Sequence, residues 1–206
     1  MSAPRGLAGN DARAERRLML DREPSVAPLS AWREGLLARR SPKNPDVAVP
    51  HFDPAEAGVH ARVLVLLESP GPRADEEAGS GFVSVDNRDA TAATAWRLRN
   101  EAGLHDHTVL WNIVPWYLGS VRAPNASETQ QGALELRRLL PLLPELRVVI
   151  TSGTQPTEGW VKYVAPFFVG GLTVINSWHP SQRSMNQPGK RDHLLRAFER
   201  AAQLAE

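Results

Sequence analysis

Short apolar runs alternate with helical segments along most of this chain, and this alternation limits the possible fold more than any other feature. Residues 62–67 form an apolar run of the length of a buried strand, which ends at the Pro and Gly residues of 70–72. Further strand-length runs lie at residues 108–114, 147–151 and 172–176. Helical patterns cover residues 90–101, 127–139, 157–164 and 190–204, and Ser127 is the N-cap candidate of the second helix. This order predicts an α/β fold, a three-layer sandwich with a central four-stranded, mostly parallel sheet flanked by helices.

The first 45 residues differ from the rest of the chain in charge. They hold nine basic and five acidic residues, a net charge of +4, whereas the remainder carries −3. A helix is expected over residues 29–39, ended by Ser41-Pro42, and the Ala-, Arg- and Gly-rich segment before it is expected to fray. We therefore divide the chain into a basic N-terminal arm with a helix, residues 1–45, and a catalytic domain, residues 46–206. The arm is either a solvated, loosely packed segment or a contact for polyanions.

Composition removes several classes of function. The chain has no cysteine, which excludes disulfide scaffolds, thiol nucleophiles, thiolate zinc sites and cysteine-ligated iron–sulfur clusters. No apolar run approaches the roughly 18 residues that span a bilayer, and the first residues contain no apolar signal core. A net charge of +1 excludes a uniformly basic coat for DNA. The expectation is a cytoplasmic protein that contacts no membrane.

Three common types of functional site do not fit the sequence: a phosphate-binding loop, a nucleophile elbow and a metal site. Gly71 stands between two prolines, without the spacing of a phosphate-binding loop. Ser181 is flanked by Pro180 and Gln182, where a nucleophile elbow would have glycines. His105 and His107 share one face of an extended segment but have no evident third metal ligand. We therefore expect no metal.

Polar and aromatic residues gather where the predicted strands end, which is where parallel sheets bind ligands. Glu68 follows the first strand, Asn112 lies near the end of the second and His179 follows the fourth. The sequence also offers flat rings nearby, at Phe82, Trp111, Trp116 and Trp178. An amide can make two hydrogen bonds to a base edge while a ring stacks on its face. Such a cleft suits a planar heterocycle, such as a base drawn out of DNA.

The same residues resemble the motifs of the uracil-DNA glycosylase superfamily. The likeness rests on Leu-Glu-Ser-Pro-Gly at 67–71, the run 75–81 leading into Phe-Val, Trp-Asn-Ile-Val at 111–114, and His-Pro-Ser at 179–181. These motifs occur in the family's order over roughly residues 61–200. They are most similar to the prokaryotic branch whose first motif reads Gly-Glu-Ala-Pro-Gly.

The resemblance implies a role for each matching residue. Catalysis would fall to Glu68, His179 and Ser69, with Glu68 orienting water and His179 stabilising the leaving base. The base pocket would contain Phe82, which stacks on uracil, Asn112, which reads its edge, and Gly71. DNA would be held by residues in and after the last motif, with Met185 as the apolar wedge: Ser181, Gln182, Arg183, Ser184, Met185, Lys190 and Arg191.

Three departures separate this chain from that branch. It lacks the four cysteines of the branch's iron–sulfur cluster, and it has Leu67 where the branch has Gly. Ser69 occupies the position at which several other branches place a water-activating Asp or Asn. Water activation is therefore assigned first to Glu68, with the acidic residues 75–77 as rivals. No aromatic residue lies between Gly71 and residue 81 to exclude the thymine methyl group.

We therefore expect a monofunctional glycosylase that excises uracil from single- or double-stranded DNA and initiates base-excision repair. The resemblance implies no cofactor, no obligatory protein partner, a monomer, and a cytoplasmic location associated with the nucleoid. Two alternatives remain open: a homologue that binds uracil or a lesion without catalysis, and a glycosylase for another deaminated base, hypoxanthine or xanthine.

Overall fold

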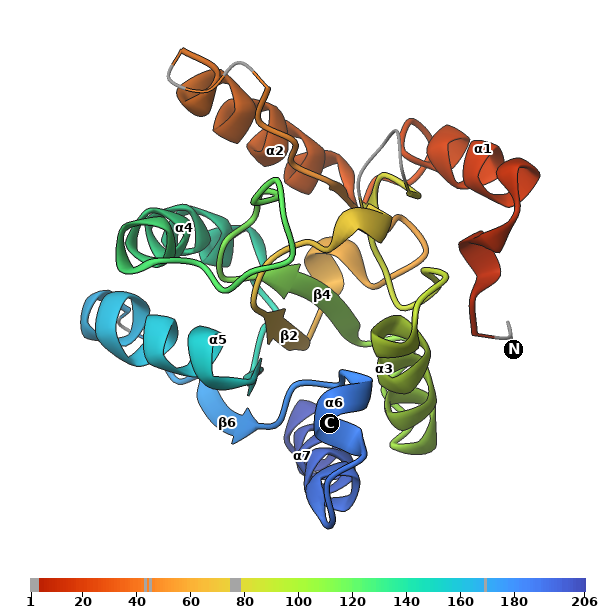
Figure 1. Cartoon of the computed structure of the whole chain (residues 1–206), viewed down its shortest axis with the longest axis vertical. Helices are drawn as coiled ribbons and strands as arrows, with labels where there is room; N and C mark the ends of the chain where they lie inside the picture. The colour runs from red at the N-terminus through yellow and green to blue at the C-terminus, as the bar shows by residue number, and fades with distance from the viewer. Residues whose placement is uncertain (1–3, 43, 45, 75–78, 169) are drawn as a thin grey trace.

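A four-stranded parallel sheet lies at the centre of the computed structural model, which describes residues 4–42, 44, 46–74, 79–168 and 170–206 (Figure 1). Its strands are β2 (Val63–Leu67), β4 (Thr108–Asn112), β5 (Val148–Ser152) and β6 (Thr173–Ser177), in the spatial order β4-β2-β5-β6. All three neighbouring pairs are parallel. The expected α/β sandwich is thus confirmed, with a sheet that is parallel throughout.

The register of the strands brings their carboxyl ends to one edge of the sheet. Leu67 of β2 lies opposite Asn112 of β4, and Ser152 of β5 lies opposite Ser177 of β6. Backbone hydrogen bonds extend this pairing past the strands, because Ile113 donates to the Leu67 carbonyl at 2.8 Å. The residues that follow the strands are therefore held close together.

Helices cover both faces of the sheet. The structure contains α1 (Asn10–Met19), α2 (Ala27–Arg40), α3 (Ala90–Glu101), α4 (Ala126–Leu139), α5 (Thr154–Gly159), α6 (Gln182–Met185) and α7 (Lys190–Ala205). Helices α4 and α5 lie on one side of the sheet, and α3 and α7 lie on the other (Figure 1). Single 3₁₀ turns are formed by Gly6–Ala8, Gly58–His60, Pro72–Ala74, Leu140–Leu142 and Ala165–Phe167.

The N-terminal residues pack against the rest of the protein, contrary to the expected loose arm. Helix α2 buries Leu29 and Leu36 completely, and its Trp32 packs edge-on against Phe52 and Trp111 at ring-centroid distances of 5.9 and 5.7 Å. Residues before α2, expected to fray, instead form α1. A small parallel sheet of β1 (His51–Phe52) and β3 (Phe82–Val83), not expected from the sequence, lies beside this region. The boundary at residue 45 therefore does not separate two independently packed bodies.

Two helices differ in detail from the sequence prediction. Helix α4 is capped by Asn125 rather than Ser127, since the Asn125 side chain accepts from the Glu128 N–H while the Glu128 carboxylate accepts from the Asn125 N–H. Helix α5 begins earlier than expected and passes into a π-helical turn over Trp160–Val164. Across the residues described, no helix combines the length and apolarity needed to cross a bilayer.

Candidate active site

The residues after β2, β4, β5 and β6 line a single cavity of about 1000 Å³ at the carboxyl edge of the sheet. Glu68, Ser69 and Gly71 follow β2, and Asn112 ends β4. His179 enters from the segment after β6. The structure therefore brings together five residues that the sequence placed in one site.

Asn112 forms the buried floor of this cavity. Its residue surface is only 2% exposed, and its side-chain Nδ2 has no hydrogen-bond partner among the described residues. Leaving a buried amide donor unpaired costs about 1–3 kcal/mol, so such groups are usually satisfied. Asn112 is among the residues that line the cavity, although the Nδ2 atom itself is buried.

His179 is held as a neutral donor. Its Nδ1 accepts a hydrogen bond from the Ser181 N–H at 3.2 Å, which leaves the proton of the neutral ring on Nε2. Burial lowers the pKa of His179 to about 4. The ring therefore offers an uncharged Nε2–H group at neutral pH.

Gly153, directly after β5, makes room for the imidazole. It adopts φ 109°, a backbone conformation that favours glycine, and a Cβ added there would lie 3.3 Å from the His179 Cβ. A side chain at residue 153 would therefore strain the backbone and press on His179.

Glu68 supplies the acidic group of the cavity. Burial raises the pKa of its half-buried carboxyl group. The backbone carbonyl of Glu68 accepts from the Val114 N–H at 3.0 Å, which ties this loop to the end of β4. Ser69 lines the cavity beside it, whereas the rival acidic residues 75–77 lie outside the described residues.

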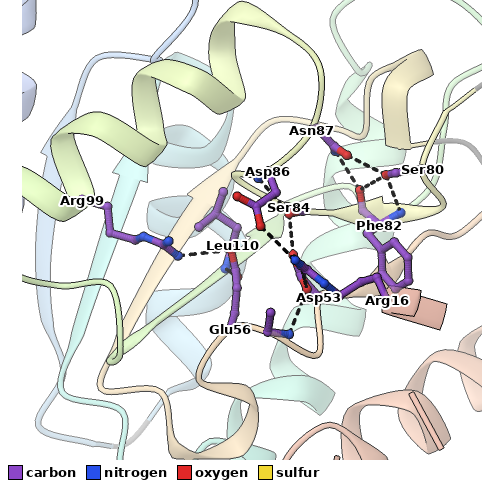
Figure 2. A network of polar contacts seen from close by, with 11 residues as sticks. Arg16, Asp53, Glu56, Ser80, Phe82, Ser84, Asp86, Asn87, Arg99 and Leu110 are labelled. Atoms are coloured by element: carbon purple, nitrogen blue, oxygen red, sulfur yellow. Dashed lines mark hydrogen bonds and ion pairs between the residues drawn. The ribbon is translucent and has the colours of Figure 1, made fainter. Parts of the chain in front are cut away.

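Phe82 does not line the cavity, which differs from the expected stacking role. Its side chain is completely buried, and its ring lies 5.9 Å from that of His51. Neighbouring residues of a strand face opposite sides, and here Val83 is the residue that reaches the cavity. Ser80 and Asn87 fix this orientation by donating to the Phe82 carbonyl oxygen at 3.3 and 2.9 Å (Figure 2).

A buried ionic network supports the same wall of the cavity. Arg16 of α1 contacts both carboxylate oxygens of Asp53 at 2.5 and 2.6 Å and one of Asp86 at 3.0 Å (Figure 2). Ser84, which lines the cavity, donates its hydroxyl to Asp53 and accepts from the Asp86 N–H at 2.9 Å. Although burial alone lowers the pKa of Arg16, the two carboxylates raise it overall. The N-terminal helix thus positions a loop of the site.

A second buried acid lies beside this network. Glu56 accepts from the Leu110 N–H at 2.9 Å, and its other oxygen lies 3.5 Å from Arg99 (Figure 2). Burial raises the pKa of Glu56, although the charge of Arg99 opposes this shift. Because Leu110 lines the cavity, this contact also supports the site from behind.

The predicted DNA contacts divide into two groups. Those that line the cavity are Ser181, Arg183, Ser184 and Lys190. Those that do not are Gln182, Met185 and Arg191. Met185 packs against the core, so it is not presented as a wedge, and Arg191 pairs with Glu101 at 3.0 Å. The packing of Met185 does not support its wedge role, whereas the contact of Arg191 with DNA stays a prediction, because an exposed ion pair opens at little cost.

Several residues at the cavity were not singled out from the sequence. Val121 is 89% exposed and lies on the loop between β4 and α4. Arg73 and Tyr117 also line the cavity. Of the tryptophans that the sequence offered as flat surfaces, Trp178 lines the cavity and is 41% exposed, whereas Trp111 and Trp116 are buried. Only the Pro-Gly residues before Arg73 and the Gly-Ser residues before Val121 could have suggested that these loops are exposed.

Comparisons with known proteins agree with this architecture. The sequence model of the family described as "Uracil DNA glycosylase superfamily" matches residues 54–203. A crystal structure of SMUG2 from Pedobacter heparinus is similar to 70% of this chain and 77% of that chain, with a TM-score of 0.50 and 13% sequence identity. At that identity the likeness concerns the fold alone. No curated protein matches the sequence.

Proposed function

Because the chain belongs to the uracil-DNA glycosylase superfamily, we propose that it hydrolyses the N-glycosidic bond of uracil in DNA, leaving an abasic site for base-excision repair. One observation carries the proposal: the unpaired amide of buried Asn112 shares a cavity with the neutral His179. The Asn112 amide can hydrogen-bond to the edge of a base, and the His179 ring can stabilise the negative charge on that base as it leaves.

Selection of uracil rests on Asn112. Its Nδ2 donates to uracil O4, which satisfies the unpaired donor, while its Oδ1 accepts from N3–H. Cytosine presents an amino donor and a bare ring nitrogen at these two positions. Each mismatch leaves a buried polar group unpaired at a cost of about 1–3 kcal/mol. Asn112 is thus both the floor of the cavity and its specificity group.

Catalysis requires stabilisation of charge at both ends of the breaking bond. His179 donates its Nε2–H toward uracil O2, where negative charge develops as the base leaves. Glu68 orients the attacking water and stabilises the positive charge on the sugar. Ser69 beside it provides a hydrogen-bonding hydroxyl, and no covalent intermediate is required.

Gly71 leaves open space in the wall of the cavity. A Cβ built at Gly71 meets no atom within 4 Å. Because of this open space, larger pyrimidines and other deaminated bases are included among the substrates that test the proposal. We further propose that the protein acts as a monomer in the cytoplasm, associated with the nucleoid, which light scattering and cell fractionation test.

The decisive assay uses oligonucleotides that carry one altered base. Single-stranded and duplex substrates contain uracil, thymine opposite guanine, hypoxanthine or xanthine, and alkali then cleaves any abasic site. Strand scission on the uracil substrates supports the proposal. Binding without scission identifies a non-catalytic homologue, and scission confined to hypoxanthine or xanthine identifies a glycosylase for those bases.

Variants of the site assign the roles. Removing one preorganised donor from a site of this type costs about 10²–10³ in rate, which is the loss expected for His179→Ala. Asn112→Ala lowers uracil release and its preference over cytosine, and Glu68→Gln slows hydrolysis. His60→Ala is the matched control, because that histidine is exposed and pairs with Glu145 away from the cavity. Wild-type activity in His179→Ala would refute the mechanism.

A further inference from the structure

We propose that Trp178 and Lys190 form a subsite for the nucleotide next to the extracted one, with the indole stacked on its base and the ammonium group on its phosphate. This inference rests on the proposed function. It adds to the proposed function a preference for single-stranded DNA, because a base can stack on Trp178 only when it is not stacked on or paired with other bases. Single-stranded DNA meets that condition without loss of base pairing.

Trp178 is an aromatic side chain left open at the mouth of the cavity. It is 41% exposed, whereas Trp32, Trp111 and Trp160 are at most 8% exposed. It nevertheless has a defined orientation, since Lys190 Nζ lies 3.6 Å from its ring centroid and the His193 ring packs edge-on at 6.5 Å. An oriented, partly exposed indole is the type of surface on which bases of single strands stack.

Lys190 provides a charge that the protein leaves available. It lies in the same cavity wall and has no carboxylate partner among the residues whose structure is described. The neighbouring Arg191, in contrast, is paired with Glu101 and Asp192. Contact with the indole holds the Lys190 ammonium group beside the stacking surface, so one nucleotide can meet both groups.

The geometry separates this subsite from the pocket for the extracted base. Asn112 is 2% exposed at the floor, while Trp178 lies at the solvent side of the same cavity. Trp178 and His179 are also consecutive residues in the irregular segment that follows β6, and both line the cavity. When His179 meets the extracted base, Trp178 therefore faces the next nucleotide of the strand.

Duplex DNA would use this subsite at a cost. The neighbouring base is paired and stacked in a duplex, and drawing it onto Trp178 requires a further few kcal/mol of unstacking. A single strand avoids that cost. We therefore expect release of uracil from single strands to depend more strongly on Trp178 than release from duplexes.

Binding of a single-stranded oligonucleotide without uracil tests the subsite independently of the reaction. Fluorescence anisotropy is expected to show about 5- to 150-fold weaker binding for Trp178→Ala, the range for one stacked base, with most affinity restored in Trp178→Phe. Lys190→Ala should reduce the slope of log affinity against log salt by about 0.7, the value for one phosphate. Trp178→Ala should leave that slope unchanged.

Phe167→Ala is the matched control. Phe167 is 60% exposed and lies under the Arg137 guanidinium at 4.0 Å, so it is also an exposed ring beside a basic group, but it lies outside the cavity. Its removal should leave binding unchanged. Equal affinities for Trp178→Ala and the wild type, or equal losses for Trp178→Ala and Phe167→Ala, would overturn the proposal.

A substrate series gives a second readout with the unmodified protein. An abasic residue is placed on the 5′ or the 3′ side of deoxyuridine in a single DNA strand, and the rate of uracil release is measured. One of the two substrates should lose about 5- to 150-fold in rate for the wild type and lose nothing further for Trp178→Ala. Equal wild-type rates on both and on the normal strand would refute the subsite. Absence of uracil release with Trp178-dependent binding would refute only the proposed function.

Discussion

Replacement of Arg16 by Gln tests whether the N-terminal helix holds the wall of the cavity. The guanidinium group bridges Asp53 and Asp86, whose side chains are 1% and 9% exposed. Gln is too short and carries no charge, so two carboxylates would remain buried without their cation. Ser84, which donates to Asp53 and lines the cavity, would lose its fixed partner.

The expected loss of stability follows from this burial. Removing one partner of a buried ion pair typically costs about 3–5 kcal/mol, because the remaining charge is uncompensated. The Arg16 side chain is 15% exposed, so water can partly replace it, which favours the lower end, about 3 kcal/mol. For a protein of this size that corresponds to a decrease in melting temperature of about 6–12 °C.

Urea unfolding followed by tryptophan fluorescence measures the effect, with Arg13→Gln as the control. Arg13 lies on the same helix and donates to the Leu7 carbonyl at 2.9 Å, an ordinary hydrogen bond worth about 1 kcal/mol.

A double mutant separates loss of the ion pair from loss of packing. Asp53→Asn in the Arg16→Gln background removes one uncompensated charge, so the double mutant should be more stable than the sum of the single effects predicts. Additive effects, or a loss in Arg16→Gln no larger than in Arg13→Gln, would refute the assignment of Arg16 as the support of this loop.

Three further perturbations probe the cavity directly. Because the pKa of His179 lies near 4, uracil release between pH 5 and 8 should show no titration near pH 6.5; an acid limb there that disappears in His179→Ala would contradict a neutral donor. Gly153→Ala should slow base release, whereas Gly103→Ala, also at positive φ but with nothing within 4 Å of its Cβ, should affect stability alone. If the exposed Val121 side chain inserts into the base stack, Val121→Ala should slow uracil release from duplexes and leave the rate on single strands unchanged. Equal decreases in rate on both substrates would exclude that role.

The central sheet could be predicted because buried parallel strands leave a simple pattern. Strands β2, β4, β5 and β6 each lie within about two residues of the apolar runs, and α3 has the expected bounds. The position of the site followed from the sheet, since polar residues at parallel strand ends must meet. Asn112 and His179 are therefore together in the cavity.

Features that depend on long-range packing could not be predicted in this way. The orientation of Phe82 depends on the pairing of β1 with β3, two strands of two residues each, which have no periodic signal. The cap at Asn125 and the expected cap at Ser127 are both favourable residue types, and only the contact with Glu128 distinguishes them. Exposure of Trp178 likewise depends on what the fold leaves uncovered.

The basic N-terminal segment is a weak candidate for DNA binding, because much of its charge is used within the protein. Arg16 is engaged by two buried carboxylates, and Arg39 pairs with Glu135 of α4 at 2.6 Å. The basic side chains of the cavity wall that have no carboxylate partner among the described residues are Arg73, Arg183 and Lys190. Three phosphate contacts on a single strand give a slope of log affinity against log salt of about −2. A slope steeper than about −4 would require phosphate contacts beyond these three and would refute this assignment.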